Sequence, residues 1–311
     1  MGSGAAGYDA RPMNTEELRT ALTDAVTCAD WVELVTRYFS AHGLHYGHGT
    51  DCSEDEAFWL VWQLHRQPDD LAAKVADQAL VDDVVQIAQQ RVDERMPLGY
   101  LLGSAWFCSL ELAVSPASLV PRSPLAETIE QGFAPWVTLA DGDRVLEIGT
   151  GSGCIAIATA VHNRGLVVDA TEIDLKALAL ARENVQRYAL TDRVQLLEAD
   201  LFPGGTERYR VIISNPPYVP TAVVRALPPE YAHEPFAALD GGDDGLDVVR
   251  RILAGARERL TDDGVLIVEV GLAAEALMAA FPQVPWTWLE FERGGDGVFL
   301  LTADELDDVW Q

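Results

Sequence analysis

Hydrophobic residues recur every three or four positions along the first third of the chain, which is the spacing of one buried helix face. The pattern is clear from Leu18 to Phe39 and resumes beyond the glycine-rich stretch that follows. We therefore predict a small helical domain at residues 14–98. The polar, glycine-rich residues 1–13 are predicted to form a flexible tail.

The pattern changes after this helical region. Residues 106–116 alternate apolar and polar positions, which is typical of a short strand or hairpin. We predict a hairpin linker at residues 99–122. A helix then opens at Pro124, since proline fits the first turn of a helix, and a second domain is predicted at residues 123–311.

Short apolar runs alternate with helical stretches through this second domain. Five runs are expected to be buried strands, at residues 145–148, 166–170, 194–200, 210–215 and 264–271. Two final strands, joined through glycines, are expected as an antiparallel hairpin within residues 287–302. Alternating strands and helices predict an α/β fold with a doubly wound, mostly parallel sheet of seven strands.

The acidic composition separates classes of partner. The 311 residues include 49 acidic and 22 basic side chains, which gives a formal net charge of −27. Such a surface repels phosphate backbones, so we expect no DNA partner, and it suits a basic protein. Simple solubility or adaptation to salt explains the charge equally well.

Other global features exclude whole classes of protein. No apolar run approaches the length of a membrane-spanning helix, so no membrane contact is expected. The four cysteines lack the spacing of a zinc site or a disulfide framework, and we expect a reducing, cytoplasmic location. We predict no metal, and we interpret one histidine group as part of a polar loop: His42, His45 and His48.

A glycine-rich loop carries the first chemical signal. Three glycines at alternate positions, within residues 149–153, separate a buried strand from an alanine-rich helix. Such a loop lets the backbone approach a ligand and leaves N–H groups free at the helix start. Glu172 stands 19 residues beyond Gly153, at the end of the second strand, where an acid can accept both ribose hydroxyls. These features indicate a nucleoside cofactor, and a ligand-free turn is the alternative.

The charge beside the loop indicates which nucleoside. Glu147 would repel a pyrophosphate, and the glycine spacing departs from the dinucleotide fingerprint. A carboxylate there favours S-adenosyl-L-methionine, which carries positive charge and no phosphate, with S-adenosyl-L-homocysteine as the product. Asp200 either bonds the adenine amino group or only caps its strand. The residues predicted to contact the cofactor are Glu147, Gly149, Thr150, Gly151, Gly153, Glu172, Ile173, Asp200, Leu201 and Asn215.

The motif Asn215-Pro216-Pro217-Tyr218 stops the fourth strand abruptly. Pro216 has no N–H and a fixed φ, so the turn is stiff and its carbonyl has no strand partner. The Asn215 side-chain oxygen and the Pro216 carbonyl can together accept both hydrogens of a planar –NH₂ group, and Tyr218 can cover one face of that group. An amide nitrogen is a poor nucleophile, so catalysis would come from orientation and from stabilising charge on the N–H groups.

These motifs resemble the HemK-type protein-(glutamine-N5) methyltransferases. The resemblance rests on residues 147–153 and 215–218, and it covers nearly the whole chain, including the helical domain. It implies that residues 123–311 are a class I S-adenosylmethionine-dependent methyltransferase domain. It also implies that residues 14–98 recognise the substrate.

The resemblance also implies roles for single residues. Phe107 and Tyr218 would pack around the substrate glutamine, and Asn215 and Pro216 would hold its amide. Arg122 would have an ordering role near the site. The implied catalytic residues are Asn215, Pro216, Tyr218 and Phe107, and the implied substrate-binding residues are Phe107, Asn215, Pro216, Pro217 and Tyr218. The segment 233–247 is expected to be a lid or a helix entry.

Within the family, the chain most resembles the branch that modifies a glutamine of large-subunit ribosomal protein three (the PrmB type). The stretches that carry this likeness are WFCSLEL, LVPRSPLAE, NPPYVP, EYAHEP, GGDDGLDVVRRIL and WLEFERGGDGVFLL. The sister branch modifies peptide release factors and usually has Pro-Arg-Pro-acid-x-Glu after the hairpin, where this chain has PRSPLAE at 121–127. The implied partner is therefore ribosomal protein three, a basic protein.

Three alternatives stay open. Release factors are the substrate in the sister branch. Adenine-N6 methylation of nucleic acid uses the same motif, because an exocyclic amine presents the same planar –NH₂ geometry. A non-catalytic scaffold that binds the cofactor is the third alternative.

Overall fold

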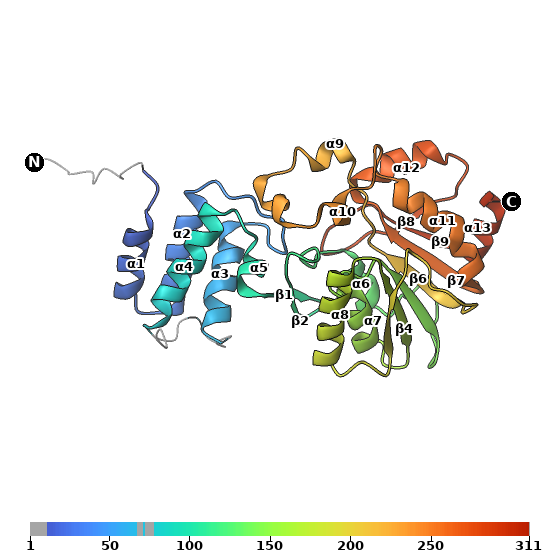
Figure 1. Cartoon of the computed structure of the whole chain (residues 1–311), viewed down its shortest axis with the longest axis horizontal. Coiled ribbons are helices and arrows are strands. Elements are labelled where there is room, and N and C mark those ends of the chain that lie inside the picture. Colours follow the sequence, from blue (N-terminus) through green and yellow to red (C-terminus); the bar gives the residue numbers. More distant parts are fainter. Residues whose placement is uncertain (1–10, 67–70, 72–77, 311) are drawn as a thin grey trace, which may run out of the picture. The chain divides into compact units, whose positions relative to one another are not determined.

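The computed structural model describes residues 11–66, 71 and 78–310. Most of the predicted flexible tail, residues 1–13, lies outside the described residues. The chain divides into two compact units, Met1–Leu102 and Gly103–Gln311. Figure 1 colours the helices of the first unit blue to teal and the second unit green to red.

The first unit is helical, as its hydrophobic spacing predicts. Its helices are α1 (Thr15–Asp24), α2 (Cys28–Ser40), α3 (Ser53–Leu64), α4 (Leu80–Asp93) and α5 (Leu98–Leu102). The first two helices are capped at their N-termini by side chains. The Asn14 side chain accepts from the N–H groups of Glu16 and Glu17, and the Thr27 side chain accepts from the Asp30 N–H. Such caps satisfy N–H groups that have no partner within the helix.

A buried ion pair holds the loop between α2 and α3. The Arg91 Nε donates to Glu56 Oε2 at 2.8 Å, and the Arg91 Nη2 donates to the His45 carbonyl at 2.7 Å. Both charged side chains are buried. The described residues 43–52 form neither helix nor strand, so the glycine- and histidine-rich stretch is a loop, as expected.

The second unit begins with the predicted hairpin. Strands β1 (Ser104–Phe107) and β2 (Leu110–Ala113) pair antiparallel. Asn184 connects this hairpin to α8 (Leu175–Arg187), because its side chain accepts from the Ala113 N–H at 2.8 Å and donates to the Ala113 carbonyl at 2.9 Å.

Seven strands form the main sheet: β3 (Arg144–Ile148), β4 (Val167–Glu172), β5 (Val194–Glu198), β6 (Tyr209–Ser214), β7 (Leu260–Glu269), β8 (Thr287–Trp288) and β9 (Val298–Thr302). Their order is β5-β4-β3-β6-β7-β9-β8, and only β9 runs antiparallel to its neighbours. This confirms the predicted doubly wound, mostly parallel sheet and its final hairpin. The strand order reverses between β3 and β6, so their carboxyl ends border the switch point at which such sheets bind ligands.

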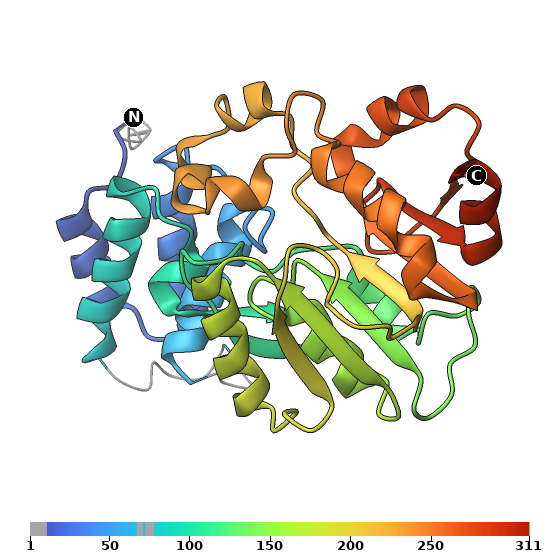
Figure 2. The same cartoon turned by 45° about the vertical axis from the view of Figure 1, so that its right-hand side comes forward.

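Helices cover both faces of this sheet. They are α6 (Leu125–Glu130), α7 (Cys154–His162), α8, α11 (Asp247–Arg259), α12 (Ala274–Ala280) and α13 (Ala303–Trp310). Val145 and Ile213 belong to the core that includes residues of α6, α7 and α8. The neighbouring Leu146 and Ile212 belong to the core that includes residues of α11, α12 and α13. Successive strand residues therefore face opposite layers, with helices on both sides (Figure 2).

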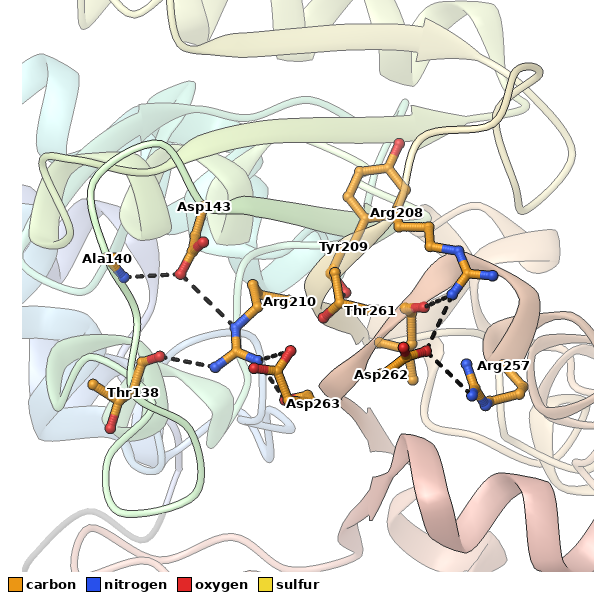
Figure 3. A network of polar contacts seen from close by, with 11 residues as sticks. Thr138, Ala140, Asp143, Arg208, Tyr209, Arg210, Arg257, Thr261, Asp262 and Asp263 are labelled. Atoms are coloured by element: carbon orange, nitrogen blue, oxygen red, sulfur yellow. Dashed lines mark hydrogen bonds and ion pairs between the residues drawn. The ribbon is translucent and has the colours of Figure 1, made fainter.

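A network of charges lies at the amino ends of the central strands (Figure 3). The Arg210 Nη2 donates to the Thr138 carbonyl at 3.0 Å, and Arg210 also pairs with Asp143 and Asp263. Asp143 in turn accepts from the Ala140 N–H at 2.8 Å. These contacts connect β6 and β7 to the loop before β3, at the end of the sheet away from the switch point. They support the fold and do not line the site.

Short helices fill the chain between β6 and α11. They are α9 (Thr221–Val224), η1 (Pro229–His233) and α10 (Phe236–Leu239). Val219 forms a parallel bridge with Asp240, and the Thr221 N–H donates to the Gly242 carbonyl at 2.9 Å. The segment predicted as a lid or helix entry, 233–247, thus pairs directly with the chain that leaves β6.

Candidate active site

Two adjoining cavities open at the carboxyl end of the sheet. The larger cavity has a volume of about 320 Å³ and is lined by the ends of β3 and β4, and the smaller has a volume of about 220 Å³ and is lined by residues that follow β6. Six residues line both cavities: Leu119, Arg122, Ser123, Asn215, Pro216 and Ala238. Groups bound in the two cavities would therefore meet beside Asn215 and Pro216.

The glycine loop forms one wall of the larger cavity. The Gly149 and Thr150 N–H groups both donate to the Thr171 carbonyl, at 3.0 and 2.9 Å, which turns the chain over the end of β4. Gly149 has a φ of +73°, and no atom lies within 4 Å of the position that a Cβ would take. Gly153 caps α7 in the left-handed region, where a Cβ would lie 3.3 Å from that of Ala181. These positions require glycine and leave the loop open to a ligand.

Glu147 lies beneath this loop and is almost fully buried. Its Oε2 accepts from the Thr150 hydroxyl at 2.5 Å and from the Ala156 N–H at 2.9 Å. Burial raises the pKa of the Glu147 carboxyl to about 8, although these two hydrogen bonds act in the opposite direction. A buried acid with a raised pKa is stabilised in its charged form by a nearby cation, so this wall favours a positively charged group.

Glu172 ends β4 and holds the loop in place. Its Oε2 accepts from the Gly151 N–H at 2.8 Å, and its Oε1 accepts from the N–H groups of Ile173 and Asp174 at 2.8 and 2.9 Å. A carboxylate has about four lone-pair positions, so Glu172 retains capacity for hydroxyl donors in the larger cavity, which it lines. The ribose contact of Glu172 stays a prediction, and its bond to the glycine loop was not predicted from the sequence.

Asp200 lies two residues beyond the end of β5, which stops at Glu198 and so is shorter than predicted. Its Oδ2 accepts from the Arg251 Nη2 at 2.7 Å, and both side chains line the larger cavity. Leu201 adopts a φ of +69° and its carbonyl accepts from the Thr171 hydroxyl at 2.7 Å. Sequence reasoning missed Arg251, because the ion pair spans 51 residues and no local motif marks it.

The larger cavity fits a nucleoside that carries a positive charge. Its lining contains four carboxylates: Glu147, Glu172, Asp174 and Asp200. Both arginines that line it are already paired with carboxylates. This balance disfavours a phosphate and suits a ligand with a cationic end near Glu147 and hydroxyl groups near Glu172.

Asn215 and Pro216 lie where β3 and β6 end side by side. The Ser214 hydroxyl donates to the Ile148 carbonyl at 2.8 Å and fixes the last residue of β6. Beyond it, neither the Asn215 side chain nor the Pro216 carbonyl bonds to any residue in the described part of the chain. Both residues line both cavities, so two acceptors are available where the cavities meet.

Tyr218 lines the smaller cavity, and its hydroxyl donates to Glu269 Oε1 at 2.8 Å. Glu269 ends β7, and its Oε2 accepts from the Ser123 hydroxyl at 2.5 Å. A Cβ at Gly271 would lie 2.8 Å from Tyr218 Cε2, so the ring packs directly on this glycine. Sequence reasoning missed Ser123 and Glu269, although an acid at the carboxyl end of a buried strand was a usable signal.

Arg122 connects the corner after the hairpin to the segment that covers the cavities. Its Nη1 and Nη2 donate to the two oxygens of Glu234 at 2.6 and 2.7 Å. Glu234 also accepts from the Val120 N–H at 3.1 Å, and the guanidinium carbon lies 5.7 Å from the centre of the Tyr231 ring. Such a bidentate pair fixes orientation, as the predicted ordering role requires.

The structure does not bring Phe107 to either cavity. Its side chain is 5% exposed and belongs to the core beneath α6 and α7, whereas its neighbour Trp106 is 36% exposed. The alternation of β1 directs Phe107 inward, which explains its position. Of the predicted substrate residues, Asn215, Pro216 and Tyr218 line the smaller cavity, and Pro217 lines the larger one.

Comparison with known proteins identifies the family. The Methyltransferase small domain family matches residues 131–227. A ribosomal protein uL3 glutamine methyltransferase from Xanthomonas campestris pv. campestris is 43% identical over 285 residues, which cover 90% of this chain and 92% of that protein. A protein of the same description from Neisseria gonorrhoeae is 40% identical, over 92% of this chain and 97% of its own length. Another, from Francisella tularensis subsp. tularensis, is 38% identical, over 90% of this chain and 91% of its own length. This chain belongs to the ribosomal protein uL3 glutamine methyltransferase family.

Membership in the uL3 glutamine methyltransferase family confirms the predicted family and the predicted class of enzyme, a methyltransferase. The roles of the individual residues stay predictions.

Other candidate groups lie away from the cavities. In the described residues, one set of side chains could hold a metal ion, with ligand atoms within 4.8 Å of one another: Cys108, Glu130 and His162. Arg293 pairs with Glu130 and places a competing cation there. All four cysteines are free. Within the ranges that the structure describes, the helices are too short or too polar to cross a membrane.

Proposed function

We propose that the protein transfers a methyl group from S-adenosyl-L-methionine to the side-chain amide nitrogen of a glutamine in ribosomal protein uL3, and releases S-adenosyl-L-homocysteine. The observation that carries this proposal is the pair of free acceptors, the Asn215 side-chain oxygen and the Pro216 carbonyl, on the wall that both cavities share. Relatives named for the same activity support it.

The larger cavity holds the cofactor, which supplies an electrophilic methyl group on a positively charged sulfur. The Glu147 carboxylate, which accepts from the Ala156 N–H, would favour the positive end. Glu172 would accept the ribose hydroxyls while its bond to the Gly151 N–H holds the glycine loop in place. Asp200 would lie beside the adenine base. Its carboxylate, which accepts from Arg251, would also accept from the adenine amino group or exchange one hydrogen bond for the other. The cavity wall is completed by Thr150, Ile173 and Leu201. Thr150 bonds to Glu147, and Ile173 bonds to Glu172.

The smaller cavity holds the glutamine side chain. Its –NH₂ group donates one hydrogen to Asn215 and one to Pro216, which turns the nitrogen lone pair toward the larger cavity. As positive charge develops on the nitrogen, both hydrogen bonds strengthen, and the stiff proline turn needs no rearrangement to provide them. Tyr218 covers the planar carboxamide, and Pro217 shapes the passage between the cavities.

The net charge is compatible with the proposed partner. A net charge of −27 suits a basic ribosomal protein and opposes DNA. We assign recognition of the substrate protein to the helical residues 14–98 and methyl transfer to residues 123–311. A cytoplasmic reaction fits the four free cysteines.

A labelling experiment tests the proposal. The purified protein and methyl-labelled S-adenosyl-L-methionine are incubated in three separate reactions. One contains isolated uL3, one a peptide release factor and one DNA. The expected result is label on uL3 alone, at one glutamine side chain identified by mass spectrometry. Label on the release factor or on DNA, with none on uL3, would overturn the proposed substrate.

A further inference from the structure

Methylation of an amide leaves one proton too many on the product nitrogen, and the smaller cavity contains a single group that can take it. The residues that line this cavity include one carboxylate, Glu269, and one cation, Arg122. The charge of Arg122 is already matched by Glu234. Glu269 is therefore the one carboxylate among the described residues that line the smaller cavity, and the proposed orientation by Asn215 and Pro216 does not use it.

Glu269 is held as a hydrogen-bond acceptor on both of its oxygens. Its side chain is 5% exposed. Ser123 donates to Oε2 at 2.5 Å, while the Ser123 oxygen accepts from the Leu125 N–H at 3.2 Å. Because that N–H can only donate, the hydroxyl proton of Ser123 points at Glu269. The carboxylate is thus positioned by the start of α6.

Tyr218 and Glu269 line the smaller cavity together and are hydrogen-bonded to each other. The Tyr218 hydroxyl donates to Glu269 Oε1 at 2.8 Å, which leaves lone pairs of the phenol oxygen free to accept. Burial, together with the nearby Glu269, raises the pKa of Tyr218, so the phenol keeps its proton and cannot serve as a base itself. A neutral phenol hydrogen-bonded to a carboxylate can instead pass a proton on.

The ring of Tyr218 is fixed in this position by glycines. It packs on Gly271, and a Cβ at Gly297 would lie 2.5 Å from Gly271 Cα. The Val270 and Gly271 N–H groups both donate to the Gly297 carbonyl, at 2.7 and 3.1 Å. The glycine-rich turn before β9 therefore braces the residues directly after Glu269.

We propose that Glu269 is the proton acceptor of the reaction and receives the amide proton through the Tyr218 hydroxyl, with Ser123 as a positioning residue. This inference rests on the proposed amide methylation. The nitrogen lone pair forms the new N–CH₃ bond as the S–CH₃ bond breaks and its electron pair stays on sulfur. The methylated amide then turns one of its two N–H groups from its Asn215 or Pro216 acceptor to the Tyr218 hydroxyl. That N–H bond breaks toward the phenol oxygen while the phenol proton moves to Glu269 Oε1. Glu269 becomes a neutral acid and returns its proton to water when the product leaves.

The electrostatic surroundings suit this role. Burial raises the pKa of Glu269, whereas Ser123, Tyr218 and Arg122 act in the opposite direction. The charged and titratable groups around it are Arg122, its partner Glu234, Tyr218 and Tyr231. A carboxylate that is ionised before the reaction and more basic than an exposed glutamate is a better proton acceptor.

The first test compares Glu269→Gln with Glu275→Gln, which removes the same charge from an exposed position on α12. We expect Glu269→Gln to lower kcat by about 100-fold or more, with KM for uL3 and the calorimetric affinity for cofactor within about threefold of wild type. Glu275→Gln should match wild type. Full turnover by a folded Glu269→Gln would overturn the relay, and a wild-type protein that leaves uL3 unmethylated would instead overturn the proposed function.

The second test measures kcat as a function of pH and adds Ser123→Ala, a variant that keeps the Glu269 carboxylate. Wild-type kcat should rise as Glu269 loses its proton, and Glu269→Gln should lose this rise. Ser123→Ala removes a donor to the carboxylate, so the midpoint should move to higher pH. In the cofactor-free protein, the midpoint of the Glu269 carboxyl band in an infrared titration should also move to higher pH in Ser123→Ala. A kcat rise that persists in Glu269→Gln would remove Glu269 from proton transfer. A midpoint that Ser123→Ala leaves unchanged in both measurements would remove Ser123 as a positioning residue.

Discussion

The Ser214 hydroxyl bonds the Ile148 carbonyl at 2.8 Å and thereby joins the carboxyl ends of the two strands that flank the switch point. One strand continues into the glycine loop and the other into Asn215 and Pro216. Together with the backbone pairing of Ile148 and Ser214, this bond fixes the glycine loop and the Asn215–Pro216 turn relative to each other in the middle of the sheet.

Asn215→Ala separates binding from catalysis. The change removes one of two acceptors for the amide and leaves the loop contacts of Glu147 and Glu172 intact. We expect kcat to fall by about 100- to 1000-fold, as for the loss of one oriented hydrogen-bond partner in a transition state. Calorimetry should give a nearly unchanged cofactor affinity, and wild-type turnover would remove Asn215 from the mechanism.

Glu172→Ala should do the reverse. The substitution removes the proposed ribose acceptor and also frees the Gly151 N–H, so the loop loses one of its three hydrogen bonds to β4. We expect cofactor affinity to fall by about 10- to 100-fold, in line with the loss of hydrogen bonds to a charged group. Glu198→Ala is the matched control, since Glu198 pairs with Glu172 in the sheet register but is exposed. Equal affinity in both variants would show that the ribose contact is misplaced.

Cofactor binding should release a proton from Glu147. With a pKa of about 8, this carboxyl is mostly protonated in the ligand-free protein near neutral pH, and a cationic ligand lowers that pKa. Affinity should therefore rise with pH up to about 8 and level off above it, by up to about tenfold per pH unit. The raised pKa also means that ligand-free stability declines as pH rises from 4.5 through about 8.

Calorimetry in two buffers of different ionisation enthalpy measures this proton. The released fraction should be substantial for wild type and absent for Glu147→Gln, whose side chain cannot titrate. The same proton release in both proteins would assign it to another group.

The Arg122–Glu234 pair should matter for stability as well as for the site. Glu234→Gln leaves a largely buried guanidinium without its counter-charge, and we expect it to cost about 2–4 kcal/mol of unfolding free energy. Arg208→Ala breaks the exposed pair with Asp262 and should cost less than about 1 kcal/mol. Denaturant titration of both variants checks this ranking, and equal losses would contradict it.

Much of the fold follows from local patterns. The strands and the glycine loop could be predicted because apolar runs, glycine positions and helix caps act over a few residues. The NPPY turn could be predicted for the same reason, since proline fixes its own backbone. Even there, one boundary was wrong: the third predicted strand ends at Glu198, and Asp200 lies beyond it.

The contacts that complete the site act over long distances in the chain. Glu234 meets Arg122 across 112 residues, and Glu269 meets Ser123 across 146 residues. No spacing rule connects such positions, because the sheet topology brings them together. Phe107 shows a different limit: the family resemblance implies a substrate contact, which stays a prediction, whereas the alternation of a four-residue strand directs the ring into the core.

The wall that the two cavities share has a practical consequence for chemical inhibition. A single synthetic compound with an adenosine portion and a carboxamide portion, joined by a short tether that passes Asn215 and Pro216, would fill both spaces at once. Each portion would raise the effective concentration of the other. Such a compound would discriminate this enzyme from other users of the same cofactor, whose acceptor sites have a different shape.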